Sequence, residues 1–388
     1  MIKVAIIGAG AISATHIEAY LAQSEPCKIV AISDVYVERA EALNERYGLN
    51  AKIYDDADTM LKEIKADLVS ICTPPASHAS LTIKTLKAGN NVLLEKPMAT
   101  SLAECDDMIA AAKENGKILS VVSQYRYTGQ YYKLKQLLKN GVAGKPLYIS
   151  IDALFYRGTE YYDLDWRGRW STEGGGCTLI HAIHFIDQLI WLCGMPNYVY
   201  AYIDNLTHEN SEVEDFTEAM LRYDNGLLGR LTCSLLHHGE RQGIEIQTDK
   251  GAIGVPFNPR VSKAMENGFP MEDLKSVEKL KVSYDSISLP SLQGHAGQIA
   301  DVIKAIKGQE STYVTGEEAR AAFELVQAIY KSATTRSEVS LPLMYSDDFY
   351  RKDTMVPLMP VFNIKTGNVK GFTTSTIKVG GSEYIEEK

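Results

Sequence analysis

Short apolar runs alternate with helical patterns over the first third of the chain. Predicted strands occupy residues 3–7, 28–33, 68–73, 92–94 and 118–123. Helical patterns between them include residues 13–22 and 37–47. This alternation predicts a parallel sheet with right-handed crossovers, in an α/β domain that ends at about residue 124.

The pattern changes after residue 124. Alternating polar and apolar positions predict strands at residues 147–155, 216–223, 226–236 and 242–248. The second and third of these are joined by Asp224-Asn225-Gly226, a strong hairpin signal. We therefore expect a largely antiparallel sheet in the second part of the chain. One face can pack on helices while the other is covered by a second copy, which predicts a homodimer or homotetramer.

A glycine turn joins the first predicted strand to the first predicted helix. It reads Gly8-Ala9-Gly10-Ala11-Ile12-Ser13. Gly8 permits a tight turn, and Gly10 lets the backbone, with the amides of Ala11 and Ile12, approach a pyrophosphate at the helix N-terminus. Ser13 stands where a third glycine or alanine is usual and is small enough for close packing. The turn predicts a dinucleotide site.

Asp34 strengthens this interpretation because it ends the second predicted strand. A carboxylate there would accept hydrogen bonds from the adenosine ribose and would repel a 2′-phosphate, which favours NAD over NADP. The alternative is a turn-forming aspartate after a strand.

Two further segments follow strand ends, where ligands bind in open α/β sheets. Thr73-Pro74-Pro75 forms a rigid loop, and His78 begins the next helix, either as a cofactor contact or as an ordinary first-turn residue. Glu95-Lys96-Pro97 ends the apolar run 91–94. A charged pair at that place is not core filling, so Lys96 is a candidate catalytic group; the alternative is a lysine that reaches to solvent.

The second part of the chain carries polar candidates of its own. Residues 178–192 are a predicted helix on which His181, His184 and Asp187 share one face. Metal binding by these three is an alternative, but their spacing matches no common metal motif, so no metal is predicted. Ahead of this helix, Trp166 and Arg169 suit a carbohydrate site, because rings stack on sugars and guanidinium groups bind hydroxyls. The alternative for that segment is a surface loop.

Composition narrows the classes of partner. The chain has 388 residues with a formal net charge of −9, which argues against nucleic acid and against an anionic membrane surface. No apolar run is long enough to cross a bilayer. The six cysteines are scattered, as expected for reduced thiols in a cytoplasmic protein.

Taken together, Gly8-x-Gly10, Thr73-Pro74-Pro75 and Glu95-Lys96-Pro97 resemble the Gfo/Idh/MocA oxidoreductase family, which includes glucose–fructose oxidoreductase and inositol dehydrogenase. The resemblance implies an N-terminal Rossmann domain (1–124) and a C-terminal α+β domain with an open-faced, mostly antiparallel sheet (125–343). The last helices of that domain pack back on the first, and a C-terminal extension (344–388) lies outside the resemblance.

The resemblance also implies roles for individual residues. Lys96 would lie near the nicotinamide and contact the substrate hydroxyl, and His184 would be the acid/base. Arg126 and Tyr127 match positions that line the substrate pocket, although a role at the domain junction is an equal alternative. His295 matches a position that approaches the active site. The chain departs from the family at Ile180, where many members have a carboxylate, and His181 could supply the missing polar contact to the substrate.

The main hypothesis is an NAD-dependent dehydrogenase that oxidises a secondary alcohol (CH–OH) of a sugar, cyclitol or glycoside. The residues predicted to contact the cofactor are Gly8, Gly10, Ala11, Ile12, Asp34, Thr73, Pro74, His78, Glu95 and Lys96. The alternatives are a glycosidase or lyase that uses NAD for transient oxidation, and a non-catalytic NAD-binding regulator.

Overall fold

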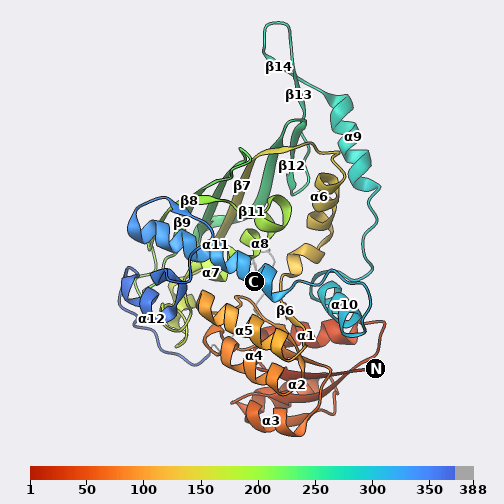
Figure 1. Ribbon diagram of the computed structural model, residues 1–388, viewed down its shortest axis with the longest axis vertical. Helices are drawn as coiled ribbons and strands as arrows, with labels where there is room; N and C mark the ends of the chain where they lie inside the picture. The colour runs from red at the N-terminus through yellow and green to blue at the C-terminus, as the bar shows by residue number, and fades with distance from the viewer. Residues whose placement is uncertain (372–388) are drawn as a thin grey trace, which may run out of the picture.

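The computed structural model describes residues 1–371, which form two large sheets with helices around them and one small two-stranded sheet (Figure 1). The first sheet is parallel, with strand order β3-β2-β1-β4-β5-β6. Its strands are β1 (Ile2–Ile7), β2 (Cys27–Ser33), β3 (Lys52–Tyr54), β4 (Leu68–Ile71), β5 (Asn91–Leu94) and β6 (Leu119–Val121). This is the predicted Rossmann arrangement. The strand β3 was not predicted, because Lys52-Ile53-Tyr54 does not form a continuous run of aliphatic residues.

Five helices connect these strands. They are α1 (Ala11–Leu21), α2 (Val37–Arg46), α3 (Ala57–Glu63), α4 (His78–Lys87) and α5 (Leu102–Glu114). The strands β1, β4 and β5 are almost wholly buried, as expected for strands covered on both faces. Their carboxyl ends bring the glycine turn, the Thr73 loop and Lys96 to one edge of the sheet.

The second sheet has seven strands in the order β12-β11-β7-β10-β9-β8-β15. It is mixed, because β7 and β10 pair in parallel while all its other pairs are antiparallel. The predicted mostly antiparallel sheet is therefore confirmed. Its strands are β7 (Pro146–Tyr156), β8 (Tyr198–Asp204), β9 (Phe216–Arg222), β10 (Leu228–Ser234), β11 (Leu236–Thr248), β12 (Gly251–Val255) and β15 (Val339–Ser340).

The predicted single helix over residues 178–192 is two helices, α7 (Cys177–Ile180) and α8 (Ile183–Cys193). The helix is interrupted by a turn at His181 and Ala182, so His181 and His184 do not lie on one continuous helix face. A continuous apolar pattern concealed this break. Together with α6 (Gly129–Lys139) and α11 (Gly316–Thr335), α8 packs near the second sheet.

Helix α10 (Gly294–Ile306) returns to the first domain and lies beside α1 (Figure 1). Its residues Ile299, Val302 and Ile303 are buried in the same apolar cluster as β1 and α1. The Gln298 side chain accepts from the Ser123 amide at 2.9 Å and donates to the Val121 carbonyl at 2.7 Å. The edge of the first sheet is thus completed by a late segment of the chain.

Two segments extend the second domain. A hairpin of β13 (Ser262–Ala264) and β14 (Pro270–Glu272) projects from it and is followed by α9 (Leu274–Asp285) (Figure 1). The described part of the C-terminal segment, which includes α12 (Lys352–Met355), lies against its own chain. Within residues 1–371, no helix is both long and apolar enough to span a membrane.

Candidate active site

The turn between β1 and α1 requires glycine at its first position. Gly8 has φ +95°, and a Cβ there would stand 2.7 Å from the Cys72 carbonyl oxygen. A Cβ on Gly10, by contrast, would meet nothing within 4 Å. Ser13 is buried and donates to the Gly8 carbonyl at 2.6 Å. The backbone of Gly10 is therefore open to a ligand, while Ser13 closes the turn from beneath.

The first turn of α1 offers donors to an anion. Gly10 caps the helix without a side-chain hydrogen bond, so no side chain competes for the amides that follow, at Ala11 and Ile12. Asp34 lies at the end of β2, where its carboxylate accepts from the amides of Ala9 (2.6 Å) and Tyr36 (2.8 Å). A carboxylate held in this way keeps lone pairs for a ribose diol. These residues fit a bound NAD, and they are the ones that would hold it.

The loop after β4 is fixed to the segment after β5 by His78. This buried ring has its two nitrogens 2.7 Å from the Thr73 carbonyl oxygen and 2.8 Å from the Pro97 carbonyl oxygen. Burial lowers its pKa. Both ring nitrogens face backbone oxygens. This arrangement favours the interpretation of His78 as an ordinary first-turn residue of α4 over a direct contact with the cofactor. Thr73 is half-buried and Pro74 is exposed, in the loop that follows β4.

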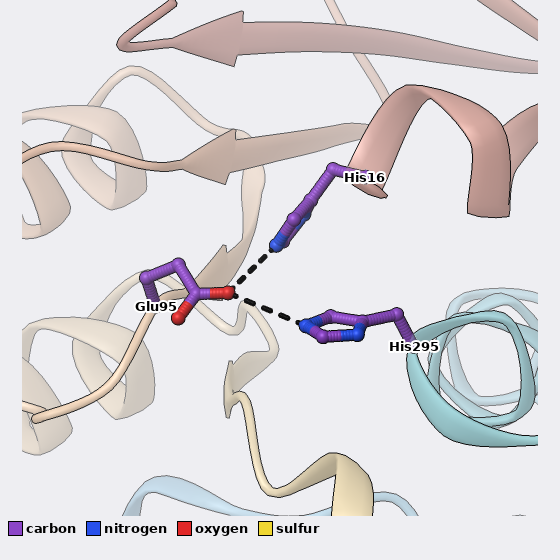
Figure 2. A group of neighbouring side chains, drawn as sticks. All are labelled: His16, Glu95 and His295. Carbon is purple, nitrogen blue, oxygen red and sulfur yellow. Dashed lines mark hydrogen bonds and ion pairs between the residues drawn. The ribbon is translucent and has the colours of Figure 1, made fainter. Parts of the chain in front are cut away.

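Glu95 is buried at the end of β5 and contacts two histidines. Its Oε1 lies 2.9 Å from His16 Nε2 and 3.6 Å from His295 Nε2 (Figure 2). Burial disfavours the charged carboxylate, but the contacts with both histidines outweigh it and hold the Glu95 pKa well below its usual range. The sequence reasoning did not identify His16, because one histidine on a helix carries no signal by itself.

Lys96 extends toward the second domain. Its Nζ donates to the Ile180 carbonyl at 3.2 Å. Burial lowers the pKa of this ammonium, while the charge of Glu95 opposes that change. Lys96 and His184 line the same small cavity, of about 20 Å³, together with Met98 and Asp187. The structure therefore brings together the two side chains predicted to be catalytic.

His184 lies in the first turn of α8 and stacks on the Tyr125 ring, with ring centroids 4.9 Å apart. Burial and then the Lys96 charge hold its pKa well below the usual value. Its imidazole is thus neutral at pH 7 and able to accept a proton. No hydrogen bond from His184 to another described residue is formed.

His181 lies in the break between α7 and α8, packed on the rings of Phe155 and Tyr161. Its Nδ1 is buried and has no hydrogen-bond partner among residues 1–371. Burial and the charges of Arg157 and Lys96 hold its pKa well below the usual value. The ring is neutral and has one nitrogen free for a ligand.

A buried carboxylate supports the short helix α7. Glu214 accepts from the Gly176 amide (2.9 Å), the Thr178 amide (3.0 Å) and the Tyr330 hydroxyl (2.8 Å). Burial raises the pKa of Glu214 to about 7. Sequence reasoning missed this residue, because nothing near it in sequence indicates its partners.

Arg126 is not free for a substrate. Its guanidinium binds Asp187 through two nitrogens, at 2.9 and 2.7 Å, and Glu318 at 2.7 Å. This pairing anchors the segment that follows β6 to α8 and α11 of the second domain. It also occupies Asp187, so the alternative metal site of His181, His184 and Asp187 is not assembled.

The remaining sugar-site candidates make contacts within the protein. Tyr127 donates to the Thr312 carbonyl at 3.4 Å, and Arg169 pairs with Glu212 at 3.2 Å. Trp166 is half-buried, with the Arg167 guanidinium 4.1 Å from its ring centroid. No contact places these three residues directly beside Lys96.

Comparison with known proteins agrees with this arrangement. Residues 2–123 match the oxidoreductase family with an NAD-binding Rossmann fold, GFO_IDH_MocA. Residues 131–254 match the GFO/IDH/MocA C-terminal domain.

Several full-length relatives are similar. A D-glucoside 3-dehydrogenase from Escherichia coli is 25% identical over 88% of this chain and 97% of its own. A myo-inositol 2-dehydrogenase from Thermotoga maritima is 28% identical over 87% of this chain and 98% of its own. The crystal structure of the WlbA dehydrogenase from Bordetella pertussis, in complex with NADH and UDP-GlcNAcA, is 28% identical. It superposes with a TM-score of 0.76 over 88% of this chain and 98% of that chain. With both of its domains matched, the chain belongs to the GFO/IDH/MocA family of NAD-binding oxidoreductases.

Proposed function

We propose that this protein is an NAD-dependent dehydrogenase that oxidises a secondary alcohol of a sugar, cyclitol or glycoside. The observation that carries the proposal is the shared cavity of Lys96 and His184, at the carboxyl edge of the NAD-binding sheet. Three similar proteins act on, or are bound to, compounds of this class: a glucoside, myo-inositol and a nucleotide sugar.

Lys96 and His184 have different roles toward the substrate hydroxyl. Lys96 donates a hydrogen bond to the reacting hydroxyl and stabilises negative charge on its oxygen, since its ammonium pairs with no described carboxylate. His184, neutral because of burial, accepts the hydroxyl proton. Bound NAD⁺ supplies the acceptor for the hydride that leaves the carbon.

His181 is proposed to take over the role of the carboxylate that many family members have at the position of Ile180. Its unpartnered Nδ1 and its position one residue after the Lys96 contact support this assignment. A buried polar atom without a partner is costly, and a substrate hydroxyl would relieve that cost. Of the other sugar-site candidates, Trp166 keeps a partly exposed ring, whereas Arg126 is already occupied.

We also infer a homodimer or homotetramer formed through the open face of the second sheet. Tyr202, Met220 and Leu228 of β8, β9 and β10 are exposed large side chains, and their 46–62% exposure supports a covered face in the assembly. A cytoplasmic location is inferred from the six unpaired cysteines, all within the described residues.

The test is a substrate panel with NAD⁺ that includes myo-inositol, D-glucose, methyl glucosides and UDP-GlcNAcA, with NADH absorbance as the readout. We expect NADH formation with at least one compound and its loss in Lys96→Ala. Lys84→Ala, an exposed lysine of α4, is the matched control and should keep full activity. Release of an aglycone without net NADH would instead identify a glycosidase or lyase. Bound NAD without turnover of any compound would identify a regulator.

A further inference from the structure

The buried carboxylate of Glu95 precedes Lys96 directly, yet the two side chains form no ion pair. The Glu95 Oε1 atom faces His16 and His295 instead (Figure 2). Its Oε2 atom accepts from the Lys96 backbone amide at 3.1 Å. The Lys96 ammonium points to the Ile180 carbonyl. A carboxylate and an ammonium on consecutive residues are thus directed to different partners.

A chain of hydrogen bonds fixes the first histidine. The Tyr20 hydroxyl lies 2.6 Å from Ser70 Oγ, which lies 3.1 Å from His16 Nδ1. Burial raises the pKa of Tyr20 and lowers that of His16, so both side chains are neutral. One assignment satisfies every group: Tyr20 donates to Ser70, Ser70 donates to Nδ1, and Nε2 donates to Glu95.

The second histidine comes from a distant part of the chain. His295 lies in the first turn of α10, and its ring centroid is 5.4 Å from that of His16. At 3.6 Å its Nε2 is beyond hydrogen-bond length from Glu95, and it has no other partner among residues 1–371. It faces the same Oε1 atom as His16 Nε2, so the two rings together face this oxygen of the carboxylate (Figure 2).

We propose that His295, with His16, is a positioning residue that holds the Glu95 carboxylate away from the Lys96 ammonium. This inference rests on the proposed role of Lys96. An ammonium locked in a buried ion pair with its neighbour would be withdrawn from a substrate hydroxyl. The two histidines give the carboxylate other partners and leave the ammonium free at the cavity that it shares with His184.

His16, Glu95 and His295 are also a possible ligand set for zinc, because one ligand atom of each lies within 4.8 Å of the others. The His16–Glu95 separation of 2.9 Å is an ordinary hydrogen-bond length, and the hydrogen-bond chain accounts for His16 without an ion. We therefore argue for the hydrogen-bonded arrangement, and metal binding becomes an outcome of the test.

The experiment compares His295→Leu, which removes the ring nitrogens, with His295→Gln, which keeps an N–H donor. Lys304→Ala, an exposed residue of the same helix, is the control. Each NAD⁺-loaded protein is assayed for kcat and KM with the best substrate of the panel, for melting temperature and for NAD⁺ affinity. The rate at which an amine-reactive ester labels Lys96 is measured by mass spectrometry, with Lys84 as the internal reference.

We expect His295→Leu to lower kcat about tenfold, equivalent to about 1.4 kcal/mol, with little change in KM or NAD⁺ affinity. Labelling of Lys96 should slow, because its ammonium becomes paired with Glu95. His295→Gln should keep most of the wild-type kcat and most of the wild-type labelling rate of Lys96. A purely structural role of His295 would not predict this difference between the two variants.

Unchanged kcat and unchanged labelling in His295→Leu would overturn the proposal. So would stoichiometric zinc in the purified protein, together with a loss of kcat on chelation. If Lys96→Ala keeps full activity, the proposed role of Lys96 in the reaction is wrong. The labelling rate of Lys96 in His295→Leu then still decides whether His295 keeps the ammonium unpaired.

Discussion

His16 is fully buried in the first domain, whereas His184 is only partly buried and lines the cavity that it shares with Lys96. Both ring nitrogens of His16 have partners, Ser70 and Glu95. His184 stacks on Tyr125 and forms no hydrogen bond within the described residues. A buried polar group whose hydrogen bonds are all satisfied stabilises the fold, whereas a partly exposed imidazole without a hydrogen bond can bind a ligand. The difference separates a supporting side of the site, in the first domain, from a reactive side in the second.

The strongest test of this comparison is replacement of each histidine by alanine. His184→Ala should lower kcat by about 10²–10⁴-fold, the usual contribution of a general base, with little loss of stability. His16→Ala should lower the free energy of unfolding by about 1–3 kcal/mol, because Ser70 and Glu95 lose a buried partner. Kinetics and urea denaturation measure both. Equal losses of stability in the two variants would refute the comparison.

The contribution of Glu214 to stability depends on pH and can therefore be measured. Its pKa is raised to about 7, from an unfolded value of 4.5, so the native state binds the extra proton between these values. That contribution to stability is present at pH 4.5 and below and is lost as pH rises through 7.

Glu214→Gln removes this titration. The free energy of unfolding of the wild type, relative to the variant, should fall by about 2–3 kcal/mol between pH 5 and pH 8. Chemical denaturation at several pH values gives the difference. The exposed Glu272→Gln is the control, and a difference independent of pH would contradict the expectation.

Asp34 is paired on the supporting side yet keeps lone pairs for a cofactor. Asp34→Asn preserves its shape and removes its charge, so the preference for NAD⁺ over NADP⁺ should fall by about tenfold, or about 1.4 kcal/mol. Titration calorimetry with both nucleotides measures it. Asp67→Asn, which also accepts a backbone amide but lies by the amino end of β1, should leave the ratio unchanged.

The smallest effect is expected from Tyr20→Phe, which removes the first donor of the hydrogen-bond chain. Loss of one neutral buried hydrogen bond should cost about 1 kcal/mol of unfolding free energy and leave kcat within about twofold. Tyr47→Phe, whose hydroxyl donates to Glu18 at the surface, should cost less. A larger loss of kcat in Tyr20→Phe would show that the supporting side takes part in the reaction.

The sequence predicted the first domain well because its signals are local. Gly8 must be glycine for its positive φ, and each buried parallel strand is a continuous apolar run. The predicted NAD-binding Rossmann fold and the family are confirmed by the comparisons. Lys96 was identifiable because a charged residue at the end of such a run is unusual.

What the sequence did not predict depends on contacts between distant residues. The break at His181 is hidden within an apolar pattern, and Glu214 meets Tyr330 across 116 positions. Arg126 fitted a sugar pocket by residue type, but Asp187 and Glu318 occupy its guanidinium. The domain boundaries at 124 and 343 remain predictions, and residues 372–388 of the predicted C-terminal extension lie outside the described part.

The return of α10 to α1 has a consequence for synthesis on the ribosome. Ile299, Val302 and Ile303 complete the apolar core around β1, so this core stays open until α10 has emerged. That segment follows the last strand of the first sheet by roughly 180 residues, which at about 5–20 residues per second takes roughly 10–40 s. During that interval the nascent nucleotide-binding half presents an apolar strip to the cell, and chaperone capture of a fragment ending near residue 124 is the expected result.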